Sequence, residues 1–148
     1  MPSAFETTRP RILVVDDDPA VRELITTRLQ LAGYVAWSAR DGREGLKMVA
    51  SLQPAALILD LNMPVLDGFG VLRGLDRASW TTKPKVMVLT ARNRPDDVRL
   101  AIELGASDFL AKPFDDRHLL ARVARLLRRH QPESNTAKPD PDAVLPDT

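Results

Sequence analysis

The 148-residue chain contains no cysteine, which excludes disulfide bonds, thiolate metal sites and thiol catalysis. Its 21 basic and 20 acidic residues give a formal net charge of only +1, so no global field attracts nucleic acid or acidic lipid. No apolar run approaches the ~18 residues of a membrane span, and the polar start lacks the apolar stretch of a signal peptide. These absences favour a soluble, cytoplasmic protein.

Short apolar runs alternate five times with segments of helical periodicity. Strands are predicted at 11–16, 34–38, 56–60, 86–90 and 109–111, and a helix follows each of them, the last over about 116–129. This alternation predicts an α/β fold, a five-stranded parallel sheet that is doubly wound with helices on both faces. Residues 1–10 are expected to be a flexible lead-in, 11–130 the domain, and 131–148 a disordered, proline-rich tail.

Two helix starts carry capping signals. Asp18 precedes Pro19, which suits an N-cap followed by proline at the first helical position. Asp41 with Glu44 three residues later resembles a capping box. Both signals support the predicted helix boundaries.

Polar side chains close four of the five predicted strands. Asp16 and Asp17 follow the first strand, Asp60 the third, Thr90 the fourth and Lys112 the fifth. The carboxyl ends of parallel strands share one edge of the sheet, where open α/β folds bind their ligands. Taken singly, each residue suits an ordinary turn, cap or surface position. Their occurrence in order at successive strand ends favours a functional site.

The three carboxylates would repel one another, by about 4 kcal/mol per pair at ~4 Å and an effective dielectric of ~20. Such a cluster must raise a pKa, recruit a cation, or both. Mg²⁺ prefers one or two carboxylates and leaves positions for phosphate oxygens. Lys112 adds a point charge and Thr90 a hydroxyl donor. This set suits phosphoryl transfer with Asp60 as the nucleophile.

The chain resembles the receiver domain of two-component response regulators over about residues 11–130. The matching segments are Val14–Asp18, Leu59–Pro64, Asp67–Gly68, Thr90–Ala91, Gly105–Ala106, Phe109 and Lys112–Phe114. The resemblance implies the flavodoxin-like strand order 2-1-3-4-5. It also implies a signalling protein that catalyses only its own phosphorylation and dephosphorylation.

The resemblance implies that Asp60 accepts a phosphoryl group from a sensor histidine kinase or a phosphotransfer protein. Asp17 and Asp60 would ligate Mg²⁺, or Mn²⁺ in its place, together with the main-chain carbonyl of Asn62. Asp16 would hold a metal-bound water. Lys112 would pair first with Asp60 and then with the phosphoryl group.

Thr90 and Phe109 are implied to be the switch residues, moving together when the phosphoryl group arrives. Asn62 and Arg92 stand at the two positions that tune phosphoryl lifetime in the family. The Lys112–Pro113 peptide bond is expected to be cis, against a general frequency of about 5–6% before proline.

The switch is implied to change the surface of the fourth helix, fifth strand and fifth helix, and so to control a downstream protein partner. The 18 residues after His130 are too few for a DNA-binding domain, so no direct DNA binding is expected of this chain, which is either a stand-alone receiver or a fragment. A monomer or weak dimer is expected. The arginines of the last helix suit either a solvated face or a partner surface.

Two other classes use parts of the same pattern. A phosphatase of the haloacid dehalogenase type needs a second aspartate two residues after the nucleophile, where this chain has Asn62, which cannot titrate. A flavodoxin-like FMN protein needs a neutral, hydroxyl-rich phosphate loop after the first strand, where Asp16, Asp17 and Asp18 would repel the phosphate.

Overall fold

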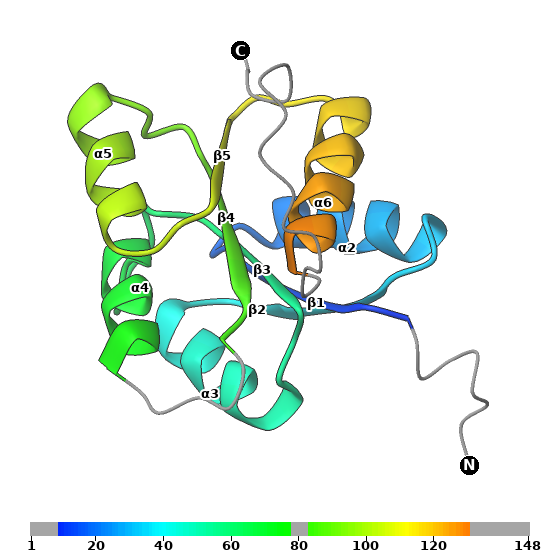
Figure 1. Cartoon of the computed structure of the whole chain (residues 1–148), viewed down its shortest axis with the longest axis horizontal. Coiled ribbons are helices and arrows are strands. Elements are labelled where there is room, and N and C mark those ends of the chain that lie inside the picture. The colour runs from blue at the N-terminus through cyan, green and yellow to red at the C-terminus, as the bar shows by residue number, and fades with distance from the viewer. Residues whose placement is uncertain (1–8, 78–82, 131–148) are drawn as a thin grey trace.

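A parallel sheet lies between two layers of helices (Figure 1). The computed structural model describes residues 9–77 and 83–130. The strands are β1 (Arg11–Val15), β2 (Val35–Ala39), β3 (Ala56–Leu59), β4 (Lys85–Thr90) and β5 (Asp108–Ala111). The helices are α2 (Pro19–Leu31), α3 (Gly42–Leu52), α4 (Gly68–Arg77), α5 (Pro95–Glu103) and α6 (Asp116–His130).

The strand order is β2-β1-β3-β4-β5 and all neighbouring pairs are parallel. This confirms the doubly wound, flavodoxin-like architecture. Within the described residues, each strand-to-strand connection crosses one face of the sheet through a helix, as a parallel sheet requires. No helix among residues 9–77 and 83–130 is both long and apolar enough to cross a membrane.

Alternation of side chains along the strands divides the core into two clusters. Ile12 and Val14 of β1 face α2 and α6, whereas Leu13 and Val15 face the layer of α3, α4 and α5. All four side chains are fully buried. Strands covered on both faces read as continuous apolar runs, which is why their positions could be predicted from sequence.

Element boundaries differ from the sequence predictions by one or two residues. β1 and β3 end at Val15 and Leu59, so Asp16 and Asp60 lie one residue beyond the regular strands. β2 is shifted by one residue, and β4 and β5 each begin one residue earlier than predicted. Such shifts are expected at element ends. The predicted tail and all but the last two residues of the predicted lead-in lie outside the described residues.

Both predicted caps are confirmed. The Asp18 carboxylate accepts a hydrogen bond from the Ala20 N–H at 2.9 Å. Asp41 accepts from the Glu44 N–H, and Glu44 in turn accepts from the Arg40 N–H, each at 2.8 Å. The Asp41 cap is thus present, whereas Glu44 reaches one residue past the N-cap to the Arg40 N–H and not to the Asp41 N–H of a regular capping box.

Gly68 allows the start of α4 to pack directly against the end of β3. A Cβ atom at Gly68 would lie 2.5 Å from the Asp60 carbonyl oxygen and 2.6 Å from Leu61 Cα. The Gly68 N–H also donates to the Leu61 carbonyl at 2.9 Å. Because Gly68 has no side chain, the start of α4 can approach the Asp60–Leu61 backbone closely enough to form this hydrogen bond, which helps to hold the segment that carries Asp60.

We expect Gly68→Ala to lower the free energy of unfolding by about 1–3 kcal/mol, because the added methyl meets backbone atoms that cannot move aside. Urea denaturation measures the loss. The matched control is Gly74→Ala, whose Cβ would meet the flexible Leu46 side chain and should cost less. Equal midpoints for the wild type and Gly68→Ala would refute the tight approach.

Candidate phosphorylation site

Three carboxylates converge at the carboxyl edge of the sheet. One oxygen each from Asp16, Asp17 and Asp60 can be chosen so that all three atoms lie within 4.8 Å of one another. Asp16 and Asp60 are buried, and Asp17 is exposed. The sequence prediction that separate strands bring these residues together is therefore confirmed by the geometry.

Main-chain hydrogen bonds hold the two buried aspartates at the ends of their strands. The Asp16 N–H donates to the Ala39 carbonyl at 3.2 Å, and the Asp60 N–H donates to the Val15 carbonyl at 3.0 Å. These bonds continue the β1–β2 and β1–β3 pairings by one residue beyond the strands. The sheet therefore fixes the backbone position of both aspartates, although the chain leaves the strand direction immediately after them.

Lys112 bridges the two buried carboxylates. Its Nζ lies 2.8 Å from Asp16 Oδ2 and 3.4 Å from Asp60 Oδ2. Its backbone N–H donates to the Thr90 carbonyl at 2.9 Å, which places Lys112 just after β5. The Lys112–Pro113 peptide is cis, as expected. The closer partner is Asp16, whereas only the pair with Asp60 was predicted.

Burial raises the pKa of Asp16 above its usual value, and the hydrogen bonds from Lys112 and from the Asp18 N–H offset this only in part. Burial alone would lower the pKa of Lys112, but the hydrogen bond to Asp16 and the negative charges of Asp60 and Asp16 outweigh it and raise that pKa. The lysine is therefore held in its charged form, while the Asp16 carboxylate remains costly to ionise.

The donor set fits a hard divalent cation. All three clustered side chains offer oxygen, and one lysine leaves two of the three negative charges uncompensated. Mg²⁺ binds such oxygen donors and keeps several waters. The Asn62 N–H donates to Asp60 Oδ1 at 3.3 Å, so this loop folds back toward the cluster, and the Asn62 side chain is exposed.

Thr90 and Phe109 lie on neighbouring strands beside the acidic cluster. Thr90 ends β4 and is fully buried, and its Oγ1 accepts a hydrogen bond from the Arg92 N–H at 3.1 Å. Phe109 lies opposite Val88 in the β4–β5 register and is half-buried against the α3–α4–α5 side of the core. Their role as switch residues stays a prediction.

Arg92 does not join the charged cluster. Its Nε lies 3.1 Å from Asp97 Oδ1, and its guanidinium carbon lies 5.3 Å from the centre of the Phe69 ring. Neither partner was predicted. Asp97 is five residues away, in the first turn of α5, and Phe69 lies in the first turn of α4, so no short sequence spacing signals either contact.

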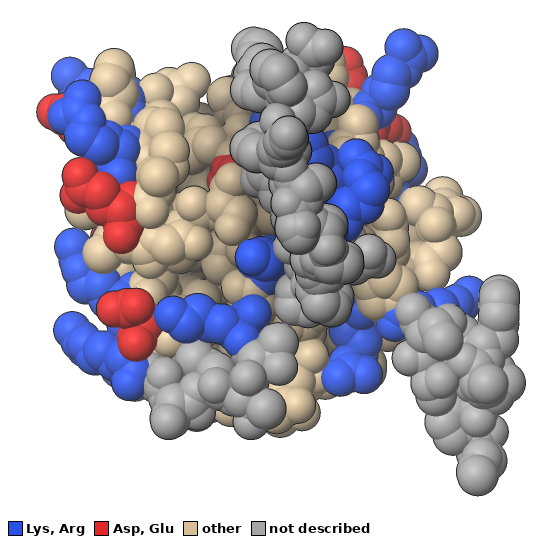
Figure 2. Space-filling model, viewed as in Figure 1, with Lys and Arg blue, Asp and Glu red and all other residues tan. Residues whose placement is uncertain are grey.

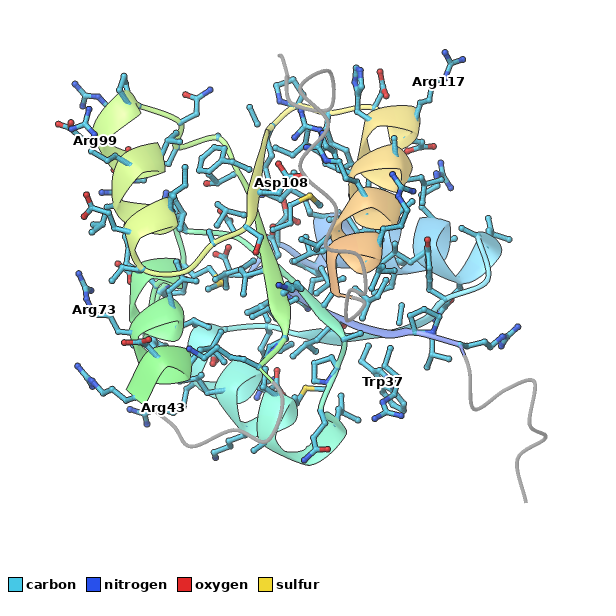
Figure 3. All side chains as sticks on the ribbon, viewed as in Figure 1. Trp37, Arg43, Arg73, Arg99, Asp108 and Arg117 are labelled. Carbon is cyan, nitrogen blue, oxygen red and sulfur yellow. The ribbon has the colours of Figure 1, made fainter. Side chains whose placement is uncertain are left out.

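Asp108 is also engaged within the chain. It accepts from Arg122 Nη1 at 3.1 Å and from Arg125 Nη2 at 3.0 Å, and Arg122 also donates to the Phe109 carbonyl at 2.9 Å. Figure 3 shows Asp108 between β5 and α6. Two of the arginines on the last helix therefore bind β5, and are not simply solvated.

A parallel sheet of this order with an acidic, lysine-paired edge defines a flavodoxin-like class of domain. The family model described as the response regulator receiver domain matches residues 12–124. The chain belongs to this family of two-component signalling domains.

Curated relatives show the same family. The chain is 44% identical over 120 residues to the DNA-binding dual master transcriptional regulator RpaA of Synechocystis sp., covering 81% of this chain and 50% of RpaA. It is 49% identical over 123 residues to the response regulator MprA of Mycobacterium tuberculosis, covering 83% of this chain and 53% of MprA. The chain thus spans about half the length of these relatives.

Solved structures agree with the fold. The chemotaxis response regulator CheY4 of Vibrio cholerae superposes with a TM-score of 0.76 at 32% identity, covering 81% of this chain and 100% of CheY4. The signal receiver domain of a response regulator from Bermanella marisrubri gives a TM-score of 0.75 at 35% identity, covering 81% of this chain and 99% of that one.

We expect Lys112→Met to lower the free energy of unfolding by about 1–3 kcal/mol, because two buried carboxylates lose their charged donor. Adding Asp16→Asn should recover part of the loss. Lys83→Met is the matched control, since Lys83 pairs with Asp76 on the exposed surface and should cost less than about 1 kcal/mol.

The pH dependence of stability gives a second measurement on the same variant. A raised lysine pKa contributes stability below the unfolded value near 10.5, and this stability is lost as pH rises through the folded value. Urea denaturation from pH 8 to above 10.5 should therefore show the wild type losing its advantage over Lys112→Met. A difference that stays constant across this range would contradict the raised pKa.

Proposed function

We propose that the chain accepts a phosphoryl group on Asp60 from the phosphohistidine of a sensor histidine kinase or phosphotransfer protein. The observation that carries this proposal is the position of the Asp60 carboxylate, buried beside two other carboxylates and within 3.4 Å of Lys112 Nζ. A structural salt bridge would need only one carboxylate per lysine. Three at one edge suit a site built for a cation and an incoming anion.

In the proposed reaction a carboxylate oxygen of Asp60 attacks phosphorus, and an acyl phosphate bond forms. The bond between phosphorus and the donor imidazole breaks, and the imidazole leaves with its electron pair. Lys112, held charged by its carboxylate partners, offsets the charge of the phosphoryl oxygens. The Asn62 N–H, which donates to Asp60 Oδ1, helps to orient the nucleophile.

Asp17, Asp60 and the main-chain carbonyl of Asn62 would hold Mg²⁺, with Asp16 acting through a bound water. Mn²⁺ takes the same oxygen donors and would substitute. When bound, the ion supplies positive charge to the phosphoryl oxygens. Without the ion, Asp16 and Asp60 share the single positive charge of Lys112, which offsets the repulsion among the carboxylates only in part.

Thr90 and Phe109 would convert phosphorylation into a change of shape. Rotation of Thr90 toward the phosphoryl group would place its hydroxyl on a phosphoryl oxygen and open space for the Phe109 ring. Phe109 has no hydroxyl, so burial alone would favour its inward position. Asn62 and Arg92, on the two loops that border the site, would tune the lifetime of the phosphoryl group.

The output surface would be α5, β5 and α6, which together would contact a downstream protein partner. Phe109 lies in β5 and is the route by which this surface would change. Figure 2 shows Lys and Arg side chains together with fewer Asp and Glu side chains on this view of the molecule. A monomer or weak dimer over residues 11–130 would suffice for this role.

Incubation with acetyl phosphate and Mg²⁺ should add one phosphoryl group, seen as a mass increase of the intact protein. Asp60→Asn should abolish the labelling, because the amide is not a nucleophile. Asp67→Asn is the matched control, since it changes a carboxylate in the same loop that caps the start of α4 through the Gly70 N–H. Full labelling of Asp60→Asn would end the proposal.

Mg²⁺ should raise the melting temperature of the wild type, because the ion binds only the folded carboxylate cluster. At ten times the dissociation constant the gain is about 1.4 kcal/mol. Asp17→Asn should lose most of this shift. Asp18→Asn should retain it, since Asp18 lies outside the cluster and asparagine keeps the cap of α2. Equal shifts in both variants would argue against the proposed ligands.

A further inference from the structure

Arg92 makes three separate contacts that tie the β4–α5 loop to its surroundings. Its backbone N–H donates to Thr90 Oγ1 at 3.1 Å. Its guanidinium pairs with Asp97 at 3.1 Å and lies over the Phe69 ring at 5.3 Å. One residue thus joins the end of β4, the first turn of α5 and the first turn of α4.

The partners of Arg92 are better fixed than Arg92 itself. The Asp97 side chain is 13% exposed and Phe69 is 5% exposed, whereas the Arg92 side chain is 44% exposed. The guanidinium therefore rests on two side chains that the helices hold in place. Ion pairing and cation–π contact both contribute modestly at a half-exposed site.

The third contact connects this arrangement to the phosphorylation site. Thr90 is 1% exposed, so its hydroxyl depends on the protein for hydrogen bonds. Among the described residues, the Arg92 N–H is the donor from which Thr90 Oγ1 accepts a hydrogen bond. Rotation of Thr90 toward Asp60 would withdraw the hydroxyl from this N–H. The β4–α5 loop would then either change its conformation or leave the Arg92 N–H without this hydrogen bond.

The loop has room to yield on its outer side. An open hollow of about 650 Å³ is lined by Arg92, Arg94, Pro95, Asp96 and Asp97. Because this hollow borders the half-exposed Arg92 side chain, the loop is not packed against other elements on this side, and the contacts of the guanidinium with Asp97 and Phe69 favour the arrangement seen here.

We propose that Asp97 is a positioning residue which, by holding the Arg92 side chain against Phe69, keeps the Thr90 hydroxyl engaged by the Arg92 N–H and so restrains phosphorylation of Asp60. This extends, and rests on, the proposed phosphoacceptor function. Removing the Asp97 charge weakens the unphosphorylated arrangement of the loop. Because the two arrangements are in equilibrium, it thereby favours the one that accepts the phosphoryl group.

Asp97→Asn tests the proposal with an unusually close control. Asp96 is the adjacent acidic residue in the same helical turn, but its partner is Arg99 on the exposed surface. Asp96→Asn removes the same charge from α5 without touching Arg92. Asp97→Glu keeps a carboxylate beside Arg92 and should restore the wild-type behaviour in both measurements below.

The first measurement is hydrogen exchange of the Arg92 amide in the unphosphorylated protein, read by NMR. Asp97→Asn should speed this exchange by about 2- to 5-fold, the range set by an exposed or half-exposed ion pair. Asp96→Asn and Asp97→Glu should leave it unchanged. Unchanged exchange in Asp97→Asn, or equal acceleration in Asp96→Asn, would overturn the proposal whether or not the protein is phosphorylated.

The second measurement is the initial rate of labelling by acetyl phosphate with Mg²⁺. Asp97→Asn and Arg92→Ala should each raise the rate about 2- to 5-fold, and the double variant should show no further increase. Additive effects would show that Asp97 acts independently of Arg92 and would overturn the proposal. A wild type that is never labelled would refute the phosphoacceptor function, while amide exchange would still decide the role of Asp97.

Discussion

Repulsion among carboxylates at the carboxyl edge of the sheet is the constraint on which the site depends. Asp16 and Asp60 follow the ends of β1 and β3 and are largely buried, so water screens their charges poorly. Lys112 reaches both from the end of β5 and compensates one of the charges. The remaining negative charge makes this part of the fold costly and would favour a bound cation.

The strands, their order along the chain and the acidic edge could be predicted because the signals are local and repeated. Each buried strand is largely an apolar run, and four of the five strands are followed or ended by a polar site residue at the same edge. Asp18 and Asp41 cap helices through bonds to residues two and three positions away, which sequence spacing encodes directly. The order of strands in space came instead from resemblance, since alternation alone allows several arrangements.

Side-chain partners could not be predicted where a residue had a choice. Lys112 can reach either buried aspartate, and only packing sets the shorter distance to Asp16. Arg92 could equally have pointed toward the acidic edge, but Asp97 and Phe69 offer a pair of contacts on the other side. Long, flexible side chains have many rotamers of similar energy, so a small difference in surroundings decides their direction.

The bonds between Asp108 and α6 have a mechanical consequence. Asp108 precedes Phe109 in β5, and Arg122 grips both the Asp108 carboxylate and the Phe109 carbonyl. Arg125 adds a second attachment one turn further along the helix. A displacement of β5 would therefore move α6 with it, unless these hydrogen bonds break. A binding partner that touches only the helix would still sense the position of the strand beneath it.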